Sequence, residues 1–75
     1  MSSEKLDFDP EDIEDLTNFL TTAVVEGDEA LSSYEIKFCD DALETLEKDG
    51  DYEVTFNREN ILLQIQDKLK EEGLV

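Results

Sequence analysis

Carboxylates are the only chemically reactive side chains that this sequence holds in number. It has 22 Asp and Glu against six Lys and Arg, no histidine, and one cysteine, Cys39. A carboxylate pair performs acid–base catalysis only in a cleft that separates the two pKa values, and acids on solvated helix faces have no such cleft. No serine lies in a nucleophile-elbow or phosphate-loop context. We therefore expect a protein that is not an enzyme and that uses no cofactor and no metal.

The net charge of −16 at pH 7 is the strongest functional signal. A magnitude of roughly 2 to 8 is enough to keep a small domain soluble. A larger surplus adds self-repulsion and favours contact with a basic surface, although solvation or adaptation to high salt would produce the same composition. The same charge repels phosphate backbones and anionic lipids. We expect a basic protein partner and no direct binding to nucleic acid or membrane.

Length and composition indicate one intracellular domain covering residues 1–75. A chain of this size buries only about 60% of its unfolded surface, which leaves a thin stability margin. Cys39 has no second cysteine to pair with, as is typical of a reducing compartment. The N-terminus lacks a basic start followed by an apolar run, and no stretch approaches roughly 18 apolar residues. The expected location is cytoplasmic.

The first helix is expected over about residues 10–25, after a flexible N-terminal arm at residues 1–8. Asp9 can cap it, Pro10 suits the first helical position, and Phe8 with Ile13 is placed as a hydrophobic staple. Glu26-Gly27-Asp28 predicts its end. The apolar stripe at helical spacing consists of Ile13, Leu16, Leu20 and Val24.

The second helix is expected over about residues 33–48, although its start is ambiguous. Ser32 with Glu35 is typical of a capping box, whereas apolar residues alternate through 34–38 as in a strand. Further on, apolar residues return at helical spacing, and Asp49-Gly50-Asp51 predicts a turn. We favour the helix.

The third helix is expected over about residues 58–72, after a short strand or extended segment at 52–56. Asn57 can cap this helix, and Phe56 with Ile61 would repeat the staple. Its buried stripe would be Ile61, Leu62, Ile65 and Leu69, with Gly73 as the stop. Three amphipathic helices with short connections predict an all-α fold, a small three-helix bundle.

Residues 47–58 resemble an EF-hand calcium loop. Asp49, Asp51 and Glu53 stand at alternate positions there. Two positions depart from the motif, because Tyr52 stands where the sharp turn needs glycine and Arg58 stands where a bidentate glutamate should close the cage. The residues therefore favour an acidic turn between helices over a metal site.

Length and acidity are also similar to those of acyl carrier proteins, but the Asp-Ser-Leu motif that carries their prosthetic group is absent. A second compositional resemblance is to the DNA mimics that phages and plasmids encode against host nucleases and other defence enzymes. It implies an inhibitor whose carboxylates, held on rigid helices, replace the phosphates of DNA, which present about one charge per 1.7 Å of helix axis. The acids that face away from the predicted core are Glu11, Glu14 and Asp15 on the first helix, and Asp40, Glu44 and Glu47 on the second.

Three further residues complete the predicted binding surface. Phe19 and Leu63 are expected at the edge of their helices, exposed, with Asp12 near Phe19. Apolar groups ringed by acids suit a contact patch on a protein partner. They suit equally a homodimer interface, which a bundle of this size often needs and which we also expect. The alternative function is therefore a structural or assembly subunit, in which the charge only confers solubility.

Overall fold

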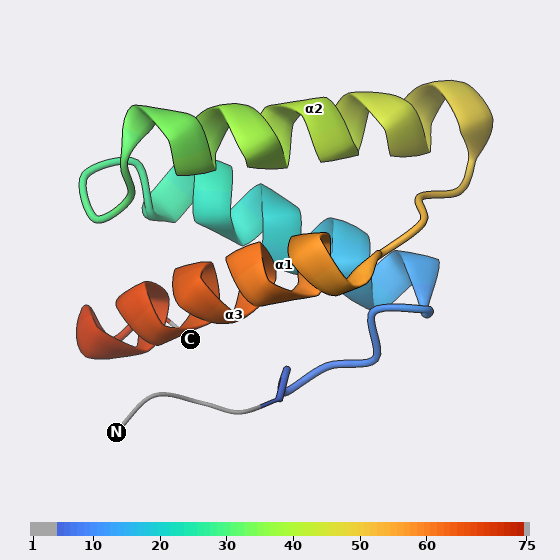
Figure 1. The fold of residues 1–75 in the computed structure, drawn as a ribbon. Helices are drawn as coiled ribbons and strands as arrows, with labels where there is room; N and C mark the ends of the chain where they lie inside the picture. The colour runs from blue at the N-terminus through green and yellow to red at the C-terminus, as the bar shows by residue number, and fades with distance from the viewer. Residues whose placement is uncertain (1–4, 75) are drawn as a thin grey trace.

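The computed structural model describes residues 5–74 and contains three helices in that range, with no strand (Figure 1). They are α1 (Ile13–Glu26), α2 (Ser33–Asp49) and α3 (Phe56–Glu71). α1 and α2 pack closely as an antiparallel hairpin, and α3 runs back along it (Figure 1). The all-α three-helix prediction is confirmed. Of the two alternatives for 52–56, the strand is wrong and the connecting segment is correct, because residues 51–55 form an irregular linker, although α3 already begins at Phe56.

The start of α1 lies three residues later than expected. Asp9 does not cap the helix. Its side chain accepts a hydrogen bond from the Glu11 amide (2.9 Å) and its carbonyl accepts one from the Asp12 amide (3.0 Å), which closes a turn before the helix. Asp12 then caps α1 by accepting from the amides of Glu14 (3.0 Å) and Asp15 (3.3 Å). Two acids three positions apart can both cap, and the second does so because the first is used in the turn.

The capping box that begins α2 is confirmed. The Ser32 hydroxyl accepts from the Glu35 amide (3.3 Å), and the Glu35 carboxylate accepts from the Ser32 amide (2.9 Å). This reciprocal pair resolves the ambiguity at 34–38 in favour of the helix. α2 ends at Gly50, whose φ of 72° places it in the left-handed region that glycine adopts without strain.

The start of α3 lies two residues earlier than expected. Thr55 is the cap, with its hydroxyl accepting from the Arg58 amide at 3.4 Å, so Asn57 lies inside the helix. Phe56 is the first helical residue and 78% of its surface is exposed. The predicted staple between Phe56 and Ile61 is therefore wrong, because the Phe56 ring points into solvent.

The core fills the space between the three helices. Phe19 belongs to this core, being only 9% exposed, and its ring stacks on Phe8 at 4.6 Å between centroids. Its expected exposure is wrong because residues near the N-terminus cover that side of α1. The other buried apolar residues of the helices are Leu16, Leu20, Ala23, Cys39, Ala42, Leu46, Leu62, Ile65 and Leu69.

The described part of the N-terminal arm, residues 5–8, lies against the bundle rather than free of it. Gln66 of α3 is 1% exposed, and its side-chain oxygen accepts from the Asp7 amide (2.8 Å). Its side-chain nitrogen donates to the Lys5 carbonyl (3.2 Å). Leu6 and Phe8 pack against the core. Residues 1–4 of the expected flexible arm lie outside the described range. Within residues 5–74, no helix is long and apolar enough to cross a bilayer.

Candidate protein-binding surface

The helix directions bring acids from distant parts of the sequence to one end of the bundle. The beginning of α1, the end of α2 and the beginning of α3 all lie at this end (Figure 1). Between them is a groove of about 750 Å³. We call it the acidic groove, and its lining is Asp9, Pro10, Glu11, Asp51, Tyr52, Glu53, Val54 and Glu59.

Arg58 is the basic residue closest in sequence to the groove residues, and among the described residues it forms no salt bridge with their carboxylates. Arg58 donates to the main-chain carbonyl of Glu53 at 2.6 Å, and its guanidinium lies 4.7 Å from the centroid of the Tyr52 ring. Burial raises the pKa of Tyr52, and the Arg58 charge opposes that rise in part. Within residues 5–74, none of the salt bridges involves a carboxylate of the groove. Five acids therefore share one concave surface without a salt bridge in the described range, and the Arg58 charge lies beside Tyr52 and Glu53.

Five predicted binding residues lie at or beside this end. Glu11 lines the groove, and Asp12 caps α1 while remaining exposed. Glu14 and Asp15 are exposed in the first turn of α1, where acids complement the positive end of the helix dipole. Glu47 is exposed near the end of α2, where the dipole opposes an acid by about 0.3–1 kcal/mol.

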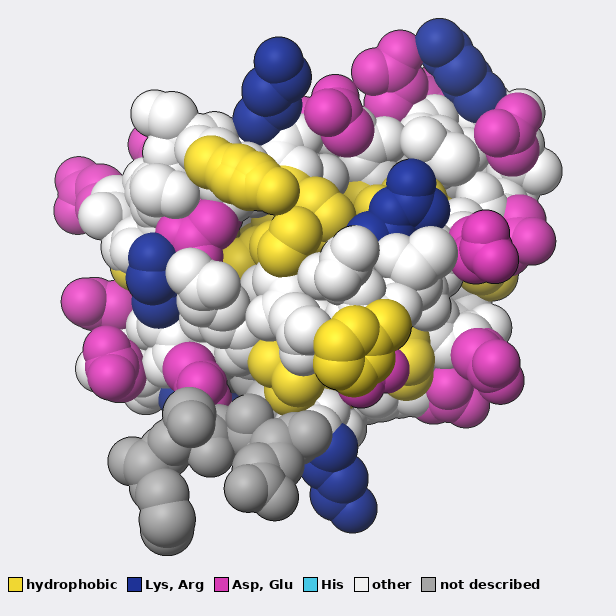
Figure 2. Space-filling model, in the orientation of Figure 1, with side chains coloured by type: hydrophobic (Ala, Val, Ile, Leu, Met, Phe, Trp, Pro, Cys, Tyr) yellow, Lys and Arg dark blue, Asp and Glu magenta, His cyan; other side chains and the backbone are white. Residues whose placement is uncertain are grey.

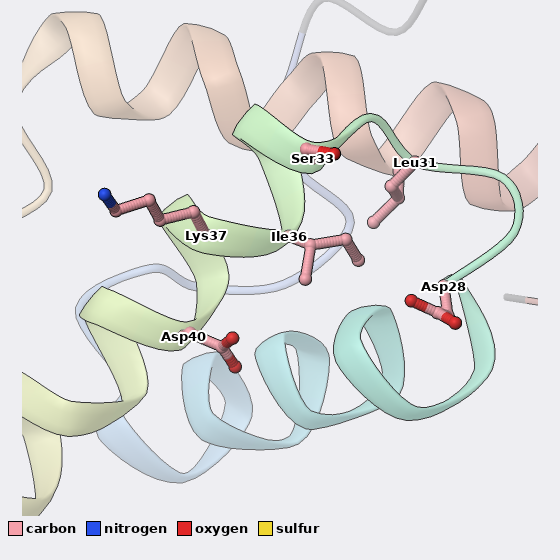
Figure 3. A pocket seen from close by; sticks show the side chains of 6 residues that line it. All are labelled: Asp28, Leu31, Ser33, Ile36, Lys37 and Asp40. Carbon is pink, nitrogen blue, oxygen red and sulfur yellow. The ribbon is translucent and has the colours of Figure 1, made fainter.

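The other four predicted residues lie elsewhere. Asp40 lines a separate shallow hollow of about 270 Å³ between the end of α1 and the start of α2. Figure 3 shows Asp28 and Asp40 on opposite sides of it, with Lys37 directed away. Glu44 pairs with Lys48 at 2.9 Å on the exposed side of α2. Phe19 is buried, and Leu63 is half-buried on α3 without packing against the core.

Sequence reasoning missed most of the acidic groove. Asp9 is predicted as a helix cap, Glu59 is not among the predicted binding residues, and Asp51 and Glu53 are predicted only as part of the loop that resembles an EF-hand. The alternation of acids in that loop was the available signal. Asp49 is the last residue of α2, so the loop does not wrap as a calcium site requires. Among the described residues no group of three or more acids or cysteines could hold a metal ion.

The six basic residues are distributed as unevenly as the acids. None occurs between Leu6 and Ile36, a segment that includes all of α1. Lys5 is the single basic residue before this segment. The other five, all on α2 and α3, are Lys37, Lys48, Arg58, Lys68 and Lys70. α1 therefore carries no basic residue, whereas α2 and α3 carry charges of both signs.

Comparison with protein-family models, with curated proteins and with solved structures found no match for this chain. No residue role is transferred to it from a relative.

Proposed function

We propose that this protein is a non-enzymatic binding module that engages a basic protein surface through the acidic groove and the neighbouring acids Glu14, Asp15 and Glu47. The observation that supports this proposal most directly is the groove itself, which gathers five carboxylates from three segments of the chain. Concave surfaces of one charge sign concentrate the field and speed the association of an oppositely charged partner.

The groove suits Lys and Arg side chains in particular. Its walls include Pro10, Tyr52 and Val54 beside the carboxylates. Lysine and arginine have long aliphatic stems that pack on apolar surface while the charged head meets an acid. The aliphatic part of a lysine or arginine side chain would lie on Pro10, Tyr52 and Val54, and its charged group would reach the carboxylates of the groove.

The partner class that fits best is a nucleic-acid-binding protein, which the module would inhibit by occupying the nucleic-acid site. Such a site is built to meet a row of negative charges, and the carboxylates gathered at one end of the bundle offer a comparable row. Duplex DNA would then compete with the module for its partner. A basic partner without a nucleic-acid site would bind the module without that competition.

The second candidate function is that of an assembly subunit, and one observation favours it. Phe56 is 78% exposed at the start of α3, and Tyr34 is 59% exposed at the start of α2. Aromatic residues are enriched at protein–protein interfaces relative to the rest of the surface. In this reading the acids keep the chain dispersed and the aromatic residues make the contact.

Charge reversal at two ends of the same helix separates these functions. The test variant is Glu11→Lys with Glu14→Lys and Asp15→Lys, at the start of α1. The matched control is Glu26→Lys with Asp28→Lys and Glu29→Lys, at its other end, where all three side chains are also exposed. Both variants carry the same net charge. Binding to basic proteins of the native extract is measured on immobilised protein, with duplex DNA as competitor and with rising salt.

The proposal expects wild type and control to retain the same basic proteins, and DNA or salt to release them. The test variant should bind at least about tenfold more weakly, since charge reversal at an interface adds repulsion to lost attraction. Equal weakening in both variants would mean that binding follows total charge alone and would overturn the assignment to this end. Retention unaffected by either variant would favour the assembly function.

A further inference from the structure

The acidic groove is lined mainly by two segments of the chain that are not helical. All of its lining residues except Glu59 belong to the turn before α1, at residues 9–11, or to the linker between α2 and α3, at residues 51–54. Figure 2, in the orientation of Figure 1, shows Asp and Glu side chains at this end of the molecule, on the right of the view. A linker lacks the repeating hydrogen bonds of a helix, so its shape depends on the side chains that contact it.

Burial alternates along this linker. Tyr52 and Val54 are half-buried and pack against the core, whereas Asp51 and Glu53 are exposed. The Asp51 carboxylate also accepts a hydrogen bond from the Tyr52 amide at 2.8 Å. The inward residues form the apolar part of the groove wall, and the outward residues supply two of its carboxylates. The wall offers both kinds of group only while this alternation is kept.

Arg58 ties the linker to α3. It lies in the first turn of α3 and is half-buried. Its Nη1 atom donates to the main-chain carbonyl of Glu53 at 2.6 Å, and its guanidinium carbon lies 4.7 Å from the centroid of the Tyr52 ring. A guanidinium suits this double contact because it can donate hydrogen bonds in its plane while stacking on a ring. One side chain therefore holds two consecutive residues of the groove wall.

The charge of Arg58 and its contacts affect the groove in opposite directions. A positive charge beside five carboxylates weakens the field that attracts a basic partner. The two contacts hold the linker in one arrangement, so a partner does not have to order it on binding. Removing the guanidinium would strengthen the attraction and at the same time loosen the wall.

We propose that Arg58 is a positioning residue of the acidic groove, which holds Tyr52 and Glu53 where the side chains of a basic partner can reach them. This inference rests on the proposed function, because it concerns the same site. It adds that the shape of the groove wall, as well as its charge, determines how long a basic partner stays bound. Charge acts mainly on the rate of association, whereas preorganised contacts act mainly on the rate of dissociation.

Stopped-flow binding of a fluorescently labelled peptide of alternating arginine and glycine to the full chain tests this role, at roughly 0.05 M NaCl. Arg58→Gln is the test variant. The matched control is Lys48→Gln, which also removes one positive charge, from an exposed pair with Glu44 on α2. Arg58→Lys keeps the charge and a donor, so its dissociation rate should lie between those of wild type and Arg58→Gln. Chemical denaturation checks that every variant is folded under the binding conditions.

Lys48→Gln should bind the peptide slightly more tightly than wild type, as expected for a more negative chain. Arg58→Gln has the same net charge and should associate at least as fast as wild type, but it should dissociate at least about threefold faster. If Arg58→Gln binds as tightly as Lys48→Gln, only the charge matters, and the positioning role is overturned while the proposed function stands. A peptide that wild type does not bind would overturn the proposed function and this inference with it.

Discussion

The ammonium nitrogen of Lys68 lies 2.6 Å from the Oε1 oxygen of Glu35, and this contact ties the end of α3 to the beginning of α2. The same carboxylate oxygen accepts the Ser32 amide and so completes the capping box. Only 4% of Glu35 is exposed. One acid in a chain dominated by exposed acids therefore performs a structural task, holding two helices together and beginning one of them.

Stability should depend on pH through Glu35. Burial alone raises the pKa of Glu35, but hydrogen bonds from Lys68 and Ser32 outweigh it and hold that pKa below its ordinary value of 4.5. A lowered folded-state pKa contributes stability above pH 4.5 that is lost as the pH falls through the lowered value. Glu35→Gln keeps a capping-box residue but removes the charge. Glu35→Gln should lower the free energy of unfolding by about 1–2 kcal/mol near neutral pH. The loss is no larger because Lys68 is partly exposed to water, which weakens the ion pair.

The measurement is chemical denaturation of wild type and Glu35→Gln across the acid range. The difference between the two should shrink as the pH drops below 4.5, whatever the other acids do to both proteins. Glu29→Gln, at an exposed position, is the control and should show little difference at any pH. A gap that does not change with pH would contradict the assignment to the Glu35–Lys68 pair.

Gly27 should not tolerate a side chain. It caps the end of α1 with an ordinary φ of −91°, so backbone strain is not the reason. A Cβ placed there would lie 2.6 Å from a methyl carbon of Leu69 and 2.7 Å from the Ala23 carbonyl oxygen. Gly27→Ala should therefore lower the free energy of unfolding by about 1–3 kcal/mol through overpacking against α3.

Denaturant titration of Gly27→Ala measures that loss, and Gly50→Ala provides the comparison. Gly50 has open space around it but a φ of 72°, so its substitution costs only backbone strain of about 1–2 kcal/mol. Crowding predicts that shortening Leu69 to Ala partly relieves the Gly27→Ala defect and leaves the Gly50→Ala defect unchanged. If the effect of Leu69→Ala simply adds to that of Gly27→Ala, as it should to that of Gly50→Ala, then crowding against Leu69 is not the cause of the Gly27→Ala defect.

Cys39 should be unreactive in the folded protein. Its side chain is fully buried, and burial together with the charges of Asp40 and Glu35 raises the pKa of the thiol to about 12. The thiolate is the reacting species, so a disulfide reagent at pH 8 should modify Cys39 only as fast as the bundle opens. Adding denaturant should speed the reaction in step with unfolding. Rapid modification of the native chain would place Cys39 in a more accessible environment than the core.

Releasing the N-terminal arm should expose a tryptic site. Gln66→Leu places an apolar side chain at this buried position and removes both hydrogen bonds to the arm. Cleavage after Lys5 should become faster, while cleavage after Lys68 inside α3 should not. Mass spectrometry of the early digest distinguishes these products. Equal acceleration at both positions would indicate global destabilisation instead.

The elements that the sequence predicted correctly are those with local causes. The capping box of Ser32 and Glu35 lies within four residues, and it correctly favoured a helix over a strand. The beginnings of α1 and α3 were wrong by two or three residues because neighbouring residues compete for each cap. Asp9 competes with Asp12, and Thr55 competes with Asn57, for the same helix amides.

The features that the sequence did not predict depend on contacts between distant segments. Phe19 is an exception, because it follows the helical spacing of Leu16, Leu20 and Ala23 and the pattern within α1 therefore already indicates burial. The stacking of Phe8 adds a contact from a distant segment. The acidic groove combines residues 9–11, 51–54 and 59, which meet only once the three helices have packed. The sequence predicted that the surface would be acidic, but which acids face one another is a property of the tertiary structure.

Gln66 holds the N-terminal arm by its main chain, because its side-chain amide bonds the backbone of Lys5 and Asp7 and neither of their side chains. Because the side-chain amide of Gln66 bonds only main-chain groups, these two hydrogen bonds do not depend on which side chains stand at positions 5 and 7. Position 5 is therefore free to vary during evolution, whereas the Asp7 carboxylate also forms a salt bridge with Lys70 and the side chains of Leu6 and Phe8 pack against the core. Relatives of this chain should therefore vary at position 5 and keep apolar residues at positions 6 and 8, with an acid at position 7 wherever a base stands at position 70.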